Sequence, residues 1–202
     1  MGLDGFDDIP ALPPEWYARH PVTVARALLG CLVIAERPEG VIAARIVETE
    51  AYGDERDPAS HASFRRNGLV RAMWGPPGTA YVYRAYGVFP CLNVVTEAVG
   101  HPSAVLIRAI EPLTGADHMA GRLGKPLGPR LASGPGLAGR GLGVTVAENG
   151  HPFDRAPLRL AAGESAGGIV AGPRIGVSRG RERLWRFGVA GHPALSRPFP
   201  RA

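Results

Sequence analysis

Long apolar runs, cysteines and clustered metal ligands are all scarce in this 202-residue chain. No apolar run reaches the roughly 18 residues of a membrane span. Cys31 and Cys91 are the only cysteines, and each lies in an apolar run typical of a buried free thiol. The histidines are scattered along the chain. We therefore expect no membrane partner, no disulfide framework, no metal site and no cofactor.

A basic leader sequence is also missing. The N-terminus carries Asp4, Asp7 and Asp8 where a signal peptide would have a basic start and an apolar block. We therefore expect a cytoplasmic protein without a signal peptide. Lysine is nearly absent as well, since Lys125 is the only one among 23 lysines and arginines. The formal net charge of +5 leans toward a polyanionic partner without identifying one.

Glycine and proline, with 28 and 20 residues, are abundant, which predicts long connections between short regular elements. The length suffices for one domain with a substantial core, and no linker or internal repeat divides it. Residues 1–21 are punctuated by prolines and are expected to form an N-terminal arm, attached by Trp16 and Tyr17. Strands are expected at 31–35, 41–50, 80–86, 91–96, 104–110, 158–160, 174–177 and 184–189. Helices are expected at 22–29, 68–74, 113–123 and 135–142.

The segment 45–52 combines strand-forming residues with two carboxylates. If it stays extended, Glu48, Glu50 and Tyr52 share one face with Ile46. The ordinary interpretation is a strand end with solvated glutamates. The alternative is a carboxylate held beside an aromatic ring, ready to accept a proton from water. Alternation alone does not choose between Glu48 and Glu50 as that base.

Tyrosines are concentrated in one part of the chain. Four of the five lie between residues 52 and 86, and Tyr81, Tyr83 and Tyr86 belong to one expected strand that ends at Gly87. One interpretation is packing within a sheet, for which tyrosine is well suited. The other is a platform on which planar bases stack, at about 1–3 kcal/mol per base. The Gly-Pro-Pro-Gly at 75–78 and Gly87 favour a hairpin held out from the body.

Three polar residues stand out from their surroundings. Arg108 lies in the apolar strand expected at 104–110, so it either reaches solvent at an edge or faces a carboxylate or phosphate in a cleft. Asn93 lies in a second apolar strand and needs hydrogen-bond partners. His61 follows Pro-Ala-Ser at 58–60, where an ordinary loop histidine is the common case. Together with Glu50 and the tyrosines, they describe a cleft.

Short motifs follow one another in a specific order between residues 48 and 112. They are Glu-Thr-Glu-Ala-Tyr at 48–52, Asp-Pro-Ala-Ser-His at 57–61, Gly-Pro-Pro-Gly at 75–78, Tyr-Val-Tyr at 81–83, Tyr-Gly at 86–87, Cys-Leu-Asn-Val at 91–94 and Leu-Ile-Arg-Ala-Ile-Glu-Pro at 106–112. This ordered set resembles the alkyladenine (3-methyladenine) DNA glycosylase family of the methylpurine glycosylase type, over roughly residues 22–190. With the strands above, the resemblance implies an α+β fold. Residues 22–202 would form a single glycosylase domain with a curved, mostly antiparallel sheet, surrounding helices and a protruding β-hairpin.

The resemblance also implies roles for the matching residues. Glu50 would be the general base that activates the water attacking the sugar C1′. Arg108 would hold that water and the nearby phosphate, and Tyr86 would wedge into the gap left in the duplex. Tyr52, Tyr83 and His61 would be the stacking rings of the base pocket. Asn93 would stand at the pocket wall, where it would clash with a guanine amino group. Tyr81 would support the pocket from behind.

The implied function is that of a monofunctional DNA-3-methyladenine glycosylase of base excision repair. It would bind double-stranded DNA as a monomer, flip an alkylated or deaminated purine out of the duplex and hydrolyse the N-glycosidic bond. It would leave an abasic site, without lyase activity, and would associate with the nucleoid of a bacterial-type cytoplasm. One alternative is a non-catalytic binder of damaged or single-stranded nucleic acid, which gains nothing from a carboxylate facing a polyanion. Another is a small-molecule nucleoside hydrolase, which needs no wedge at Tyr86.

Some positions depart from the family pattern. Leu69 and Val70 stand where Arg-Asn is frequent, so the anchoring of that loop is open. Leu137 stands where a lysine is usual after Ser-Gly-Pro at 133–135, so a phosphate contact is open too. Arg84 replaces an apolar residue between the tyrosines and is expected to add a contact to the DNA backbone.

Overall fold

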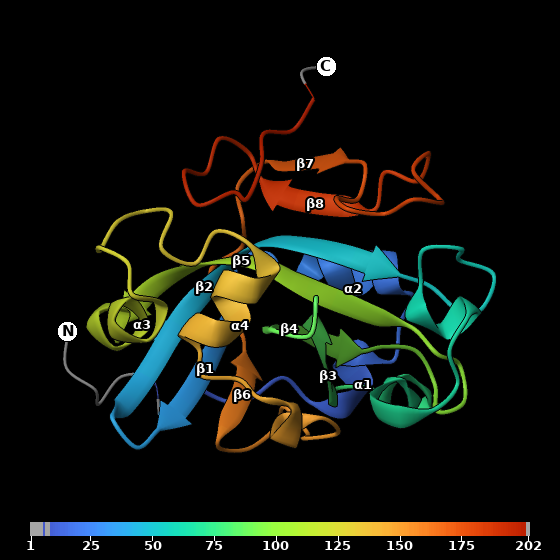
Figure 1. The fold of residues 1–202 in the computed structure, drawn as a ribbon, viewed down its shortest axis with the longest axis horizontal. Coiled ribbons are helices and arrows are strands. Elements are labelled where there is room, and N and C mark those ends of the chain that lie inside the picture. The colour runs from blue at the N-terminus through green and yellow to red at the C-terminus, as the bar shows by residue number, and fades with distance from the viewer. Residues whose placement is uncertain (1–5, 7–8, 201–202) are drawn as a thin grey trace.

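The computed structural model describes residue 6 and residues 9–200, whose eight strands form one curved sheet (Figure 1). The strands follow the order β3-β4-β5-β2-β1-β6, and β8 pairs with both β2 and β7. Their bounds are β1 Leu32–Arg37, β2 Gly40–Tyr52, β3 Ala80–Ala85, β4 Phe89–Val95, β5 Ala104–Thr114, β6 Leu158–Ala161, β7 Ile169–Gly172 and β8 Arg186–Val189. Each of these pairings is antiparallel. The expected α+β fold is confirmed.

β2 is the strand around which the sheet is built. Its first half pairs with β1 and its residues 48–50 pair with β8 along the same edge, while β5 follows the other edge. A strand with neighbours on both edges and cover on both faces must be apolar over most of its length. Ile42, Ile46 and Val47 meet this requirement and have no exposed surface. The two glutamates of β2 are therefore carried into the interior by an otherwise apolar strand.

A β-bulge at Val47 changes the alternation of β2. The register with β5 passes from Ile46 opposite Ile110 to Glu48 opposite Ala109, so one residue of β2 is left over. Ile46 and Ala51 both pack in the main core, whereas Glu48 and Glu50 both bond to one arginine away from it. The expectation that Ile46 shares a face with the glutamates is wrong, because a bulge shifts the two-residue period by one.

Short helices cover the sheet. Their bounds are α1 Pro14–Tyr17, α2 Pro21–Ala27, α3 Ala116–Leu123 and α4 Pro135–Gly141, with 3₁₀ helices at η2 His61–Ser63, η3 Gly68–Trp74 and η4 Val146–Glu148. α2 lies behind β2 and β5 in Figure 1 and begins at Pro21, with His20 accepting a hydrogen bond from the Val22 amide. The Ala25 carbonyl of α2 accepts a 2.8 Å hydrogen bond from the Thr49 hydroxyl, which fixes α2 against β2 beside Glu50.

Several expected elements differ in the structure. The strand expected at 174–177 is irregular, because the Arg174 guanidinium and the Ile175 amide bond to other segments rather than to a strand partner. β7 lies earlier, at Ile169–Gly172, where no strand was expected. The helix expected from residue 113 begins at Ala116, since β5 continues to Thr114 and Gly115 turns the chain at φ 71°. Residues 68–74 are helical, but of the 3₁₀ type.

The chain before α2 packs onto the domain. Tyr17 is 1% exposed and belongs to the main core. Its ring lies against Gly78, where a Cβ would come within 2.7 Å of the tyrosine Cδ2. The Leu12 amide donates a 2.8 Å hydrogen bond to the Leu160 carbonyl of β6. Of the expected arm at 1–21, residues 1–5 and 7–8 lie outside the described part of the chain.

Candidate active site

Five strands each place one side chain in a row across the sheet. The row consists of Tyr81 on β3, Asn93 on β4, Leu106 on β5, Glu50 on β2 and Arg186 on β8, each opposite the next. Directly opposed residues of antiparallel strands point to the same face. One face of the sheet therefore gathers an aromatic ring, an amide, a carboxylate and a guanidinium that lie far apart in the sequence.

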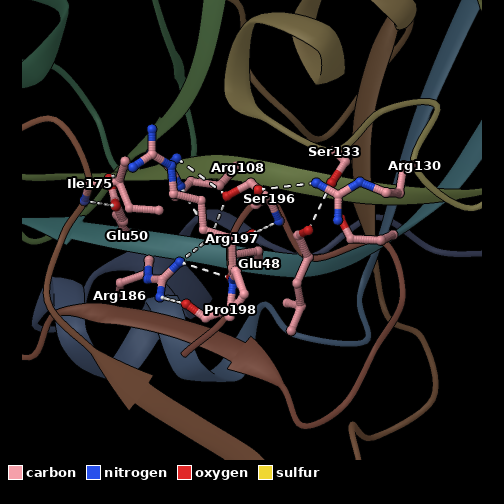
Figure 2. A network of polar contacts seen from close by, with 12 residues as sticks. Glu48, Glu50, Arg108, Arg130, Ser133, Ile175, Arg186, Ser196, Arg197 and Pro198 are labelled. Atoms are coloured by element: carbon pink, nitrogen blue, oxygen red, sulfur yellow. Dashed lines mark hydrogen bonds and ion pairs between the residues drawn. The ribbon is translucent and has the colours of Figure 1, made fainter. Parts of the chain in front are cut away.

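Glu50 has no exposed surface, and three donors hold its two oxygens; Figure 2 shows two of them, the Ile175 amide and Arg108. Its Oε1 accepts a 2.7 Å hydrogen bond from the Ile175 amide. Its Oε2 accepts hydrogen bonds from the Tyr52 hydroxyl at 2.7 Å and from Arg108 Nη1 at 3.1 Å. Burial raises the pKa of Glu50 above that of an ordinary glutamate, although the three donors oppose the shift. A carboxylate with a raised pKa accepts protons more readily than a solvated one.

Arg108 is buried in β5 and joins the two glutamates of β2. Its Nη1 donates to Glu50, and its Nε donates to Glu48 Oε1 at 3.3 Å. The first of the two interpretations of Arg108, an edge residue reaching solvent, is therefore wrong. Arg108 faces carboxylates in the interior, which is the arrangement that a buried guanidinium requires.

Glu48 bonds to residues that sequence analysis did not single out. Its carboxylate accepts hydrogen bonds from the Ser196 amide and hydroxyl and from Arg186 Nη1, besides the one from Arg108. The only signal in the sequence is that Arg186 adjoins an apolar segment, as Arg108 does. Four donors on a fully buried carboxylate leave Glu48 less free than Glu50 to orient a water molecule.

Tyr52 ends β2 with one ring face covered. The Arg174 guanidinium lies 4.9 Å from the centre of the Tyr52 ring. Arg174 in turn forms a two-pronged, buried ion pair with Asp57. Burial tends to raise the pKa of Asp57, but the hydrogen bonds from Arg174 and the Gly53 amide hold it below its usual range. Arg174 and Asp57 were not expected at the site, and together they cover one face of the Tyr52 ring.

An aromatic cluster stands at β3. The His61 ring packs edge-on against Tyr83, with centroids 4.6 Å apart, and the Tyr81 and Tyr83 rings are 5.5 Å apart. The Tyr81 hydroxyl and His61 Nδ1 share a 2.6 Å hydrogen bond. Burial, aided by Arg65, lowers the pKa of His61, so its ring is neutral at pH 7. The expected grouping of His61, Tyr81 and Tyr83 is thus present in the structure.

Asn93 is fixed by the backbone beside this cluster. Its Nδ2 donates to the Tyr81 carbonyl at 2.9 Å and to the Cys91 carbonyl at 3.2 Å. Asn93 is 3% exposed, so its side chain cannot swing away without leaving a buried amide unpaired. The asparagine is therefore a rigid group on the face that carries Glu50.

Tyr86 lies at the tip of the β3–β4 hairpin and is 94% exposed. It adopts φ 52° and is followed by Gly87 at φ 73°, with the Val88 amide bonded to the Ala85 carbonyl. A non-glycine residue at positive φ is strained by roughly 1–2 kcal/mol. An aromatic side chain that is both strained and exposed contributes little to the stability of the fold and is accessible to a binding partner.

The part of the chain that the structure describes contains neither a metal-binding cluster nor a membrane-spanning helix. Residues 6 and 9–200 contain no group of three or more histidine, cysteine, aspartate or glutamate side chains placed to hold a metal ion. Among these residues, no helix is long and apolar enough to span a bilayer. Cys31 and Cys91 are buried free thiols, as expected.

The site combines a buried carboxylate–arginine pair with aromatic rings and an exposed aromatic hairpin tip, in a chain of net charge +5. This combination is typical of an enzyme that acts on bases in nucleic acid. Comparison with known proteins agrees. The family described as methylpurine-DNA glycosylase (MPG) matches residues 15–193. The chain belongs to this methylpurine-DNA glycosylase family.

Relatives provisionally named 3-methyladenine DNA glycosylases are similar over nearly their whole length. A protein of Nitrosospira multiformis is 45% identical over 183 residues, which is 91% of this chain and 92% of the relative. One from Rhodopseudomonas palustris is 45% identical over 190 residues, covering 94% and 92%. One from Methanocella arvoryzae is 43% identical over 197 residues, covering 95% and 98%.

Proposed function

We propose that this protein flips alkylated or deaminated purines out of double-stranded DNA and hydrolyses their N-glycosidic bond with water activated by Glu50. The observation that carries the proposal is Glu50 itself. It is a fully buried carboxylate held by the Ile175 amide, Tyr52 and Arg108, on the sheet face that also bears the aromatic cluster. A buried carboxylate costs several kcal/mol of desolvation, and a protein that only binds a polyanion has no use for it.

The base would bind between aromatic rings. A base inside a duplex cannot be reached, so the nucleotide must be extruded at a cost of a few kcal/mol. Tyr52 would offer the ring face opposite Arg174, and Tyr83 with His61 would offer a second wall, each stacking contact contributing about 1–3 kcal/mol. Alkylation makes a purine cationic or electron-poor, which strengthens its attraction to tyrosine faces. The rigid Asn93 amide would exclude bases that carry a guanine amino group.

The chemical step needs a negative charge near the sugar. Cleavage of the glycosidic bond gives the sugar oxocarbenium character, which a carboxylate stabilises. Glu50 would take a proton from the attacking water as the water oxygen bonds to C1′ and the purine leaves with the bond electrons. Arg108 would orient the same water and contact a DNA phosphate. The products are a free base and an intact abasic site, so the enzyme would be monofunctional.

The test is excision by a variant without the base. Duplex DNA with a single hypoxanthine or ethenoadenine is incubated with excess enzyme, and the released base is measured. Glu50→Gln keeps the shape and the hydrogen-bonding oxygen but loses the basicity, so excision should fall by several orders of magnitude while lesion DNA still binds. Glu39→Gln, at an exposed glutamate paired with Arg122, is the matched control and should excise normally.

Two results would contradict the proposal. Excision by Glu50→Gln near the wild-type rate would remove Glu50 as the base and move attention to Glu48. Tight lesion binding by the wild-type protein without release of any base would favour the non-catalytic binder instead.

A further inference from the structure

The segment 196–199 follows β8 and a turn, and its residues 196–198 fold back beside Glu48 of β2 (Figure 2). The Ser196 amide donates a 2.6 Å hydrogen bond to Glu48 Oε2, and its hydroxyl donates one of 2.8 Å to Glu48 Oε1. The same hydroxyl accepts a hydrogen bond from Arg108 Nη2 at 3.4 Å. Ser196 therefore touches both Glu48 and Arg108, although it lies 88 positions beyond the arginine in the chain.

Arg186 anchors this segment a second time. Its Nη1 donates to the Arg197 carbonyl at 3.3 Å, and its Nη2 donates to the Pro198 carbonyl at 2.9 Å. Its guanidinium also lies 3.8 Å from the centre of the Phe199 ring. Because Arg186 Nη1 bonds to Glu48 as well, the segment and the carboxylate are held as one unit.

The three nitrogens of the Arg108 guanidinium have three different partners. Nε bonds to Glu48, Nη2 to Ser196 and Nη1 to Glu50. An arginine beside a free carboxylate prefers a two-pronged pair, with two parallel N–H groups on the two oxygens. Glu48 and Ser196 hold the Nε and Nη2 side of the guanidinium, and in this orientation Glu50 receives a single hydrogen bond, from Nη1.

We propose that Ser196 and Glu48 are positioning residues, which turn Arg108 so that Glu50 keeps an oxygen lone pair for water. The inference rests on the proposed role of Glu50 as the base. Without the serine hydroxyl, the Nη2 side of the guanidinium is no longer held, and Arg108 can rotate onto Glu50. A two-pronged ion pair would stabilise the carboxylate, weaken it as a base and occupy the site of the water.

The direct test is Ser196→Ala, at a half-buried position where loss of one hydroxyl is compatible with folding. The single-turnover excision rate at neutral pH should fall about tenfold, as misplacement of a catalytic group does. Affinity for lesion DNA should stay within twofold of wild type. The acid limb of the rate against pH should move to lower pH, because Arg108 then favours the ionised form of Glu50 more strongly. The other groups that act on the charge of Glu50 stay in place, namely Glu48, Tyr52, Tyr83, Cys91 and Arg186.

Two further variants separate positioning from folding. Ser196→Thr keeps the hydroxyl and should excise at close to the wild-type rate. Thr145→Ala removes a hydroxyl that caps η4, so it should lower the melting temperature without changing the rate or its pH dependence.

Three outcomes would overturn the inference. The first is that Ser196→Ala has the wild-type excision rate and the wild-type acid limb. The second is that the alanine and threonine variants lose the same amount of excision rate. The third is that the loss of rate in Ser196→Ala is matched by an equal loss of affinity for lesion DNA. Wild-type enzyme and Glu50→Gln are assayed alongside. If wild type releases base and Glu50→Gln does not, a normal Ser196→Ala removes only the positioning role. If wild type releases no base, the proposed function itself fails.

Discussion

The chemistry of Glu50 depends on opposing influences on one carboxyl group. Burial favours the neutral form, whereas Arg108, the Ile175 amide and Tyr52 favour the charged form. Burial prevails, so the pKa is raised and excision should be lost on acidification at a pH above that of an ordinary glutamate. Each donor can be removed singly, which makes the balance testable.

Tyr52→Phe should move the acid limb of the excision rate to higher pH. The variant keeps the stacking ring but removes the hydroxyl that donates to Glu50 Oε2 at 2.7 Å. Since that hydrogen bond stabilises the ionised carboxylate, its loss raises the pKa of Glu50 further. The measurement is the single-turnover rate against pH. Tyr17→Phe is the matched control, because the buried Tyr17 hydroxyl has no hydrogen-bond partner among the described residues. A shift to lower pH, opposite to this expectation, would show that Tyr52 does not act through Glu50.

At the scale of single residues, the sequence predicted which groups meet but not which partners fix them. Glu50, Tyr52 and Arg108 could be named in advance, because charges and rings are conspicuous in apolar strands. The choice between Glu48 and Glu50 could not be made from alternation, since both occupy one face. Ser196 and Arg186 distinguish the two glutamates, and nothing local in the sequence connects them to β2.

At the scale of elements, the β3–β4 hairpin could be predicted from the sequence, whereas the bulge in β2 could not. Alternating apolar residues and the turn glycine predicted the hairpin, because its register is set locally. The bulge at Val47 could not be predicted, since it arises from the pairing of β2 with a strand over fifty residues later. The strand at 174–177 was predicted wrongly, because Ile175 and Val177 are β-branched but their segment bonds to Glu50 and Asp57 instead.

The hairpin tip makes a separate prediction. Tyr86→Ser should weaken binding to lesion duplex about tenfold or more, the equivalent of one lost stacking contact. The melting temperature should hardly change, because Tyr86 is 94% exposed. The measurements are lesion affinity by titration and thermal unfolding. Val88→Ser alters a neighbouring exposed residue of the same turn and should bind normally. A collapse of thermal stability with unchanged affinity in the surviving protein would assign Tyr86 to the fold rather than to a wedge.

At the scale of the whole molecule, the positive charge is carried almost entirely by arginine, which lacks the nucleophilic amine that lysine has. Arginine supplies nearly all of the 23 basic residues, so the surface can attract a phosphate backbone while offering almost no nucleophilic amine. Lys125 follows α3, which packs against the Gly40 end of β2 (Figure 1). Gly115, which immediately precedes α3, lies against Ile42 of β2. Glu50 is eight residues further along the same strand, which corresponds to roughly 25 Å from Ile42.

The lack of a lysine near the carboxylates predicts the product of the reaction, an abasic site in an uncut strand. Glycosylases that also cut the strand form a Schiff base between an amine and the sugar, and that amine must reach C1′. Lys125 is exposed and follows α3, whose first turn lies at the Gly40 end of β2 and not at the Glu50 end. Borohydride added during turnover should therefore trap no protein–DNA adduct, and the product strand should stay intact until alkali cleaves it at the abasic site. Lys125→Arg should excise and behave identically. A trapped adduct that maps to Lys125 or to the N-terminal amine would replace hydrolysis by water with covalent catalysis.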